Sequence, residues 1–61
     1  MTEEDDKIIE MMEKYGGSFV KALSNCARYA DSINFVRLKE TFNEYFVEYN
    51  EFVRRAENKV N

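Results

Sequence analysis

Apolar side chains recur at helical spacing from the first turns of the chain onwards. The apolar face of this first stretch consists of Ile8, Met11, Met12 and Tyr15. Thr2, followed by an acidic turn, is typical of a helix N-cap. Gly16 and Gly17 indicate where the helix ends, because glycine readily adopts the left-handed conformation that closes many helices. We therefore predict a helix over residues 3–15.

The second stretch follows the pattern i, i+3, i+4, i+7, i+8, i+11, which is typical of an amphipathic helix. Its apolar members are Phe19, Ala22, Leu23, Cys26, Ala27 and Ala30. Ser18 stands where a side-chain N-cap is expected, and Asp31 with Ser32 indicates the start of the next helix. We predict a helix over residues 18–30, in which Cys26 is a packed small side chain.

The remaining pattern predicts one long helix over residues 32–59, which no Gly or Pro interrupts. A heptad seam of aromatic and aliphatic residues runs along it. The seam consists of Phe35, Leu38, Phe42, Tyr45, Tyr49, Phe52 and Ala56, and Phe46, Val53 and Val60 widen it. At 1.5 Å per residue this helix would be about 40 Å long, about twice the length of either earlier helix.

Because the third helix is so much longer, the two short helices alone are not expected to cover all of its aromatic seam. Two short helices packed side by side would leave Tyr45, Phe46, Tyr49 and Phe52 facing water. Either the short helices lie end to end along the long one, or the long helix packs on a second copy. We expect both, and predict an all-α, three-helix domain over residues 1–61 that forms a homo-oligomeric bundle, most often a dimer. A weaker apolar strip is either another interface or ordinary surface: Ile33, Val36 and Val47.

Composition narrows the function. The chain has no His, which removes the imidazole base and ligand used by most acid–base and zinc sites. Its single Cys cannot form a disulfide within the chain, which fits a reducing cytoplasm. No apolar run exceeds three residues, so neither a membrane span nor a signal peptide is expected. We expect a cytoplasmic, non-enzymatic protein without catalytic residues, metal, cofactor or membrane partner.

Charge is unevenly distributed over a chain whose net charge is −3. Residues 1–14 are mostly acidic, whereas residues 15–39 carry a basic excess. One interpretation is that the basic middle pairs with the acidic first helix, within a chain or between chains. Four or five cations in a net-acidic chain are too few for strong binding to duplex DNA, which argues against a nucleic-acid partner.

The other interpretation of the basic region is a ligand site. A glycine-rich turn that opens a helix presents free N–H groups, which suit phosphate or carboxylate. A polar stripe continues from this turn along the second helix and ends in a partly aromatic, basic surface. The candidate ligand-binding residues are Gly16, Gly17, Ser18, Lys21, Asn25, Arg28, Tyr29 and Arg37. The preceding strand and the Gly-Lys-Ser/Thr ending of a phosphate-binding loop are missing, so nucleotide hydrolysis is not expected.

Several short motifs together resemble a recurrent group of very short phage and prophage proteins. The matching residues are Gly16-Gly17-Ser18-Phe19-Val20-Lys21-Ala22-Leu23, Ala30-Asp31, Asn34, Arg37-Leu38-Lys39, Phe42-Asn43-Glu44-Tyr45-Phe46 and Tyr49. The resemblance covers residues 15–50 and implies a phage setting, without a settled activity. In related members a Pro often precedes the Glu-Tyr pair. Because Asn43 stands there in this chain, we expect its long helix to be straighter.

These patterns lead to three functional hypotheses. The first is a phage-encoded oligomer that counters a host defence system by sequestering a phosphate-bearing small molecule, such as a signalling nucleotide. The alternative is an inhibitor that docks directly on a host defence protein through its aromatic and charged helical surface. The weakest is a small nucleic-acid-binding regulator, against which the charge balance argues.

Overall fold

A computed structural model describes residues 2–58, and this part of the chain forms four α-helices and no strand. They are α1 (Glu3–Tyr15), α2 (Ser18–Tyr29), α3 (Ser32–Thr41) and α4 (Asn43–Glu57). The all-α prediction is confirmed, and the first two helices lie where the sequence places them. The prediction of three helices is wrong, because the expected long helix is divided into α3 and α4. Its expected end at Lys59 and the flanking Val60 lie outside the described residues.

The break falls at Phe42, whose backbone leaves the helical region at φ −112° and ψ 37°. Packing across the bend accounts for it. Phe35 of α3 meets Phe46 of α4 edge to face, with ring centroids 6.0 Å apart. In a straight helix the same eleven residues would separate the two rings by about 16 Å along the axis. The segment thus bends at Phe42 although Asn43, and not Pro, follows it.

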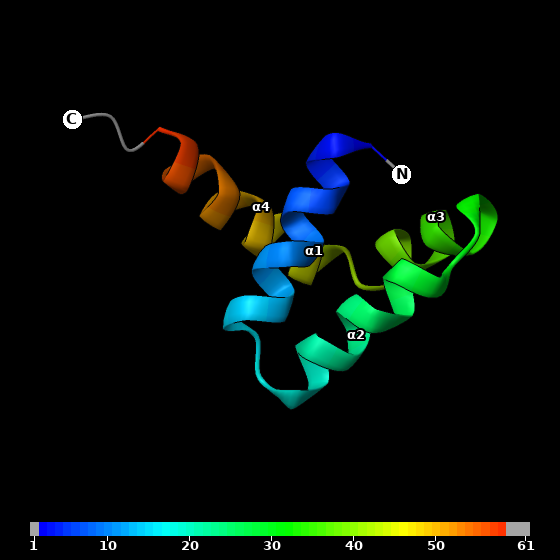
Figure 1. Ribbon diagram of the computed structural model, residues 1–61. Helices are drawn as coiled ribbons and strands as arrows, with labels where there is room; N and C mark the ends of the chain where they lie inside the picture. The colour runs from blue at the N-terminus through cyan, green and yellow to red at the C-terminus, as the bar shows by residue number, and fades with distance from the viewer. Residues whose placement is uncertain (1, 59–61) are drawn as a thin grey trace.

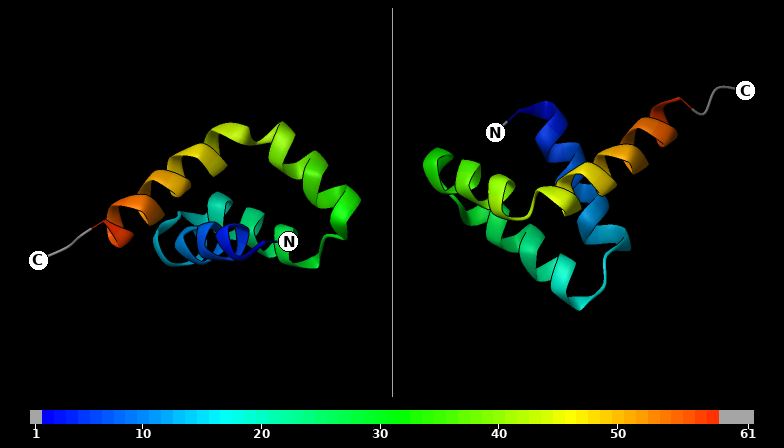
Figure 2. Two further views of the ribbon diagram at one scale, coloured as in Figure 1. Left: turned by 90° about the horizontal axis from the view of Figure 1, so that it is seen from above. Right: turned by 180° about the vertical axis from the view of Figure 1, so that it is seen from behind.

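The helices form two layers. Seen from above, α3 and α4 form an arch over α1 and α2 (Figure 2). In the front view α1 crosses α4, and α2 runs away from this crossing towards α3 (Figure 1). The smallest extent of the molecule is 17 Å, which matches two layers of helices spaced about 8–10 Å apart.

Side chains cap the N-termini of two helices, α1 and α3, as the sequence predicts. Thr2 caps α1, and its side chain and backbone exchange hydrogen bonds with Asp5. Asp31 caps α3 by accepting a hydrogen bond from the N–H of Asn34 at 2.8 Å. The expected cap at Ser18 is wrong, because Gly17 occupies the N-cap position of α2 and no side chain caps it. Thr2 and Asp31 were thus correctly identified from sequence alone.

The expected left-handed glycine at the end of α1 is also wrong, since neither glycine has a positive φ. Gly16 is extended at φ −76° and ψ 155°. Its small size matters for another reason. A Cβ there would lie 2.5 Å from the Met12 carbonyl oxygen and 2.5 Å from Val20 Cγ1. Gly16 thus lets α1 and α2 approach each other, whereas a Cβ at Gly17 would point into open space.

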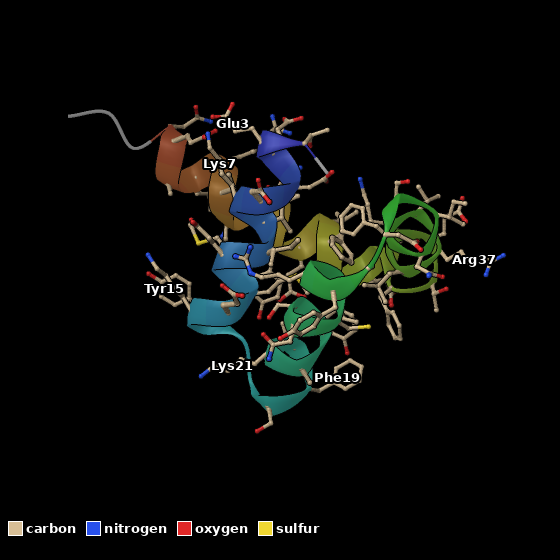
Figure 3. The ribbon with its side chains drawn as sticks, turned by 45° about the vertical axis from the view of Figure 1, so that its right-hand side comes forward. Glu3, Lys7, Tyr15, Phe19, Lys21 and Arg37 are labelled. Carbon is tan, nitrogen blue, oxygen red and sulfur yellow. The ribbon has the colours of Figure 1, made fainter. Side chains whose placement is uncertain are left out.

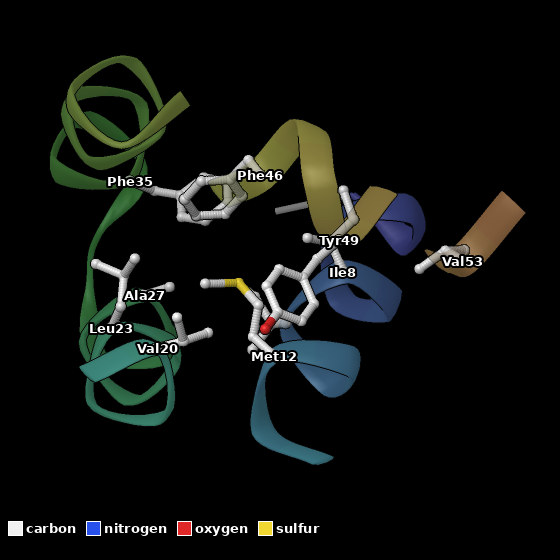
Figure 4. Close-up of a cluster of buried hydrophobic side chains, with 10 residues drawn as sticks. Ile8, Met12, Val20, Leu23, Ala27, Phe35, Phe46, Tyr49 and Val53 are labelled. Carbon is white, nitrogen blue, oxygen red and sulfur yellow. The ribbon is translucent and has the colours of Figure 1, made fainter. Parts of the chain in front are cut away.

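The core forms mainly where α1, α2 and α4 meet (Figure 4). Ile9, Met12 and Ala27 have no exposed surface. The predicted seam also turns inward: Phe35, Phe46, Tyr49 and Val53 are buried, and Leu38, Phe42, Tyr45 and Phe52 are partly buried against them. The prediction that two short helices of the same chain cannot cover the far half of the seam is wrong, because these side chains pack against the core of a single chain. The seam therefore gives no reason for a second copy.

Candidate functional site

A concave surface lies between α2 and α3. It has a volume of about 580 Å³, within the range of small-molecule sites. Its lining residues are Cys26, Tyr29, Ala30, Asn34, Arg37, Leu38, Thr41 and Phe42. Two of the predicted ligand-binding residues, Tyr29 and Arg37, therefore meet in one groove. We call this surface the α2–α3 groove.

A tight connection creates this groove. Helix α2 ends at Tyr29, and the N–H of Ala30 bonds to the Ala27 carbonyl oxygen at 3.3 Å. Asp31 then starts α3 at once through its cap. Only two residues separate the helices, so α3 turns back beside α2 (Figure 1). The Ala-Asp turn thus brings side chains three and four residues apart on each helix to the same groove.

The groove combines an apolar wall with polar groups. Leu38 and Phe42 supply much of the apolar surface, and Asn34 and Thr41 offer hydrogen-bonding side chains. Arg37 supplies a positive charge, and it forms no ion pair with any other residue between 2 and 58. A flat ring fits against the apolar wall, while a guanidinium binds carboxylate or phosphate in bidentate fashion.

Tyr29 is the most exposed large apolar side chain of the described chain, with 90% of its surface accessible. Because it lies at the groove, its ring is available to stack on a planar ligand.

The glycine turn lies elsewhere. Lys21 follows it in the first turn of α2, eight residues before Tyr29 and hence about 12 Å away along the helix axis. Lys21 and Arg37 lie on opposite sides of the molecule (Figure 3). The N–H of Gly16 is already bonded to the Met12 carbonyl oxygen at 3.0 Å. The structure therefore separates Gly16, Gly17, Ser18 and Lys21 from the α2–α3 groove.

Arg28 and Asn25 lie on the exposed surface of α2 and do not line the groove. The guanidinium of Arg28 donates two hydrogen bonds to Glu13 of α1, at 2.6 and 3.1 Å. This contact lowers the pKa of Glu13 below its ordinary value. Arg28 thus joins the acidic first helix, as the pairing interpretation of the basic region predicts.

Helix α1 forms one ion pair with each of the other three helices in the described chain. Glu13 pairs with Arg28 of α2, Lys7 with Glu57 of α4, and Asp5 with Lys39 of α3 at 3.2 Å. Lys39 also lies over the Phe35 ring, 5.7 Å from its centroid. Helix α1 is therefore tied to every other helix of the described chain. Two of its carboxylates, Glu13 and Asp5, are already paired with cations of the same chain.

Several groove residues were not predicted as ligand-binding. The heptad pattern predicts that Leu38 and Phe42 belong to an oligomer seam, and no sequence pattern marks Thr41 as a ligand-binding residue. Cys26 was expected to be packed, but it is exposed and lines the groove. That expectation is wrong because the second helix packs with Val20, Leu23 and Ala27 inward, which turns Cys26 towards the edge. The tight connection at Ala30 and Asp31, which turns α3 back beside α2, brings these residues together.

A smaller concave surface of about 410 Å³ lies between the end of α1 and α4, lined by Tyr15, Glu48, Tyr49, Phe52 and Arg55. No group of three metal-binding side chains occurs between residues 2 and 58. Within the same range, no helix has the length and apolar character that crossing a membrane requires. Comparison of the chain with protein-family models, curated proteins and solved structures finds no match. Of the concave surfaces described, the α2–α3 groove is the one that brings predicted ligand-binding residues together.

Proposed function

We propose that this protein is a non-enzymatic binding protein that sequesters a phosphate-bearing small molecule, such as a signalling nucleotide, in the α2–α3 groove. The observation that carries the proposal is that Arg37, which has no ion-pair partner among residues 2–58, and the exposed ring of Tyr29 lie beside one apolar wall. A nucleotide presents the complementary features, namely a flat base and an anion.

Each part of the groove has a distinct role in this proposal. The base lies against Leu38 and Phe42, and Tyr29 stacks on it. Arg37 holds the phosphate, and the Asn34 amide bonds to polar groups of the base or sugar. Sequestration, rather than catalysis, is proposed because the chain has no His to serve as a base near its single thiol.

The biological setting is part of the same proposal. The motifs that resemble short phage and prophage proteins include Ala30-Asp31, Asn34 and Arg37-Leu38, which form or line the groove. A phage protein that binds a host signalling molecule stoichiometrically would counter a host defence system in the host cytoplasm.

Assembly of several copies is also proposed, on a different basis from the aromatic seam. Ile33 and Val36 of α3 and Val47 of α4 are 68%, 53% and 55% exposed, so each of these apolar side chains remains uncovered in the single chain. Exposed apolar surface of this kind favours contact between copies. Native mass spectrometry of protein taken from infected cells tests this part, because it reports copy number and any retained ligand together.

The binding proposal is tested by titrating the full chain with mononucleotides and dinucleotides, with inorganic phosphate as a reference. Arg37→Glu should weaken binding by about 10-fold or more, as expected for loss of a charge-assisted contact. Tyr29→Ala should weaken it by a similar factor through lost stacking. Arg55→Glu, a matched charge reversal on α4, should leave binding unchanged. Loss of binding in Lys21→Glu alone would instead locate the site at the glycine turn.

A second function, docking on a host defence protein, is favoured by the same exposed side chains of Ile33, Val36 and Val47. Its prediction differs from that of sequestration. Ile33→Asp would abolish capture of the target in a pull-down, whereas Arg37→Glu would abolish only nucleotide binding. Tyr49 is buried, so its substitution would disturb the fold and cannot serve as a surface test.

A further inference from the structure

Helix α3 forms one wall of the groove, and it is weakly anchored. Phe35 is its only buried side chain, whereas α1 buries four of its residues. Its apolar residues Ile33 and Val36 face solvent. The position of α3 relative to α2 therefore depends on few contacts, and each of them affects the shape of the groove.

One of these contacts is an ion pair on the side of α3 away from the groove. Lys39 lies two residues from Arg37, which is about 200° around the helix, and five residues from Asn34, which is about 140°. Its ammonium donates to Asp5 Oδ1 at 3.2 Å. The pair thus ties the outer side of α3 to α1, while Arg37 and Asn34 line the groove.

Asp5 is a fixed partner for this contact. Its side chain is buried, and its second oxygen accepts the Thr2 N–H at 3.2 Å. The N–H of Asp5 in turn bonds to the Thr2 hydroxyl at 3.1 Å. Because the helix cap already orders this carboxylate, Lys39 binds to a positioned group, whereas most surface ion pairs must order both side chains.

We infer that the Asp5–Lys39 pair is a positioning contact that sets the place of α3 beside α2 and thereby the ligand affinity of the groove. The affinity part of this inference rests on the proposed function, whereas the placement of α3 does not. Neither side chain lines the groove, so any effect on binding must act through the helix that carries Arg37.

The test uses Lys39→Met, which keeps an unbranched apolar stem over Phe35 and removes the charge. Lys39→Arg is the conservative rescue, and Lys7→Met is the matched control, because Lys7 pairs with Glu57 and does not contact α3. Amide hydrogen exchange is measured without ligand. In Lys39→Met, exchange within α3 should rise about 3- to 10-fold while α1, α2 and α4 keep their rates. Lys39→Arg should restore the parental rates, and Lys7→Met should leave α3 unchanged.

Nucleotide affinity is then measured for the same three variants. Weaker binding by Lys39→Met together with faster α3 exchange supports the inference. Unchanged α3 exchange, or an equal rise in all four helices, overturns it. If α3 responds but the parent binds no nucleotide, the proposed function fails and the placement of α3 stands. If the parent and Lys39→Met bind equally tightly, the proposed function stands and the coupling to affinity fails.

Discussion

Helices α1 and α3 are similar in length but differ in what holds them. Helix α1 has a complete capping box, four buried residues and an ion pair to each other helix. Helix α3 has a single-residue cap, one buried ring and two exposed apolar side chains. The comparison indicates that the core supplies stability through α1, whereas the proposed binding surface is built on the helix that is least fixed.

The largest expected effect is in the core beneath α1. Ile9→Ala removes a side chain with no exposed surface and should lower the free energy of unfolding by about 2–5 kcal/mol. A single core of this size rarely supplies more than about 3–5 kcal/mol, so the variant should be largely unfolded at 37 °C. Circular dichroism with chemical denaturation measures this. A loss below 1 kcal/mol would contradict the proposed central role of α1.

Phe35→Ala tests the other side of the comparison. It removes the one buried side chain of α3 and its edge contact with Phe46. We expect α3 to detach while α1, α2 and α4 stay folded, since they form the core without it. Hydrogen exchange should therefore become fast in α3 and remain slow at Ile9 and Met12. Uniform loss of protection in all helices would show that α3 is an integral part of the core.

The two glycines provide a matched pair at the α1–α2 connection. Gly16→Ala places a methyl group against the Met12 carbonyl oxygen and Val20, and should cost about 1–3 kcal/mol. Gly17→Ala meets open space at φ −74°, and should change stability by no more than about 1 kcal/mol, since the lower backbone entropy of Ala in the unfolded chain offsets its weaker N-cap preference. Denaturant midpoints of the two variants decide this. Equal effects would mean that the close approach at Gly16 is not required.

The smallest expected effect is the pH dependence of the Asp5–Lys39 contact. Burial alone would raise the pKa of Asp5, but the hydrogen bonds from Thr2 and Lys39 and the positive charge outweigh it and lower that pKa below 3.8. A carboxyl whose pKa is lowered by folding stabilises the protein above its unfolded pKa and loses that contribution as pH falls through the folded value.

We therefore expect the parent to be more stable than Lys39→Met by about 0.5–1 kcal/mol at pH 6, and the difference to vanish near pH 2. Glu13 also has a lowered pKa, so both proteins lose stability in acid and only their difference reports on Asp5. Urea denaturation at the two pH values measures it. A difference that persists at pH 2 would assign the effect to the contact of the Lys39 ammonium with the Phe35 ring rather than to its pairing with Asp5.

Local signals predicted the parts of the fold that depend on local chemistry. Thr2, Asp31 and the apolar spacing of the first two helices act within a few residues, so the helices they define were predicted nearly to their ends. The bend at Phe42 has no such signal, because no Gly, Pro or side-chain cap marks it. It arises from contacts between Phe35 and Phe46 and between Phe19 and Phe42, which the heptad pattern alone does not reveal.

For the candidate site too, the sequence predicts the chemistry of single residues but not which of them lie together. Tyr29 and Arg37 were identified as residues suited to bind an anionic, planar ligand, and both line the groove. The sequence pattern groups the glycine turn with them because both belong to the second helix. In the structure, however, the turn lies at the start of α2 and Tyr29 at its end, so the length of the helix separates them. Leu38, Thr41 and Phe42 line the groove because the Ala-Asp turn sets α3 beside α2, and the helical pattern alone does not predict that pairing.

The exposed Cys26 gives this chain a practical property. It is the only thiol in the sequence, and it lies on the wall of the α2–α3 groove. An environment-sensitive fluorophore coupled to it would be attached at one defined position without any engineered residue. Its emission would change when the groove fills or when α3 moves, so one labelled sample would report on occupancy and helix displacement in real time.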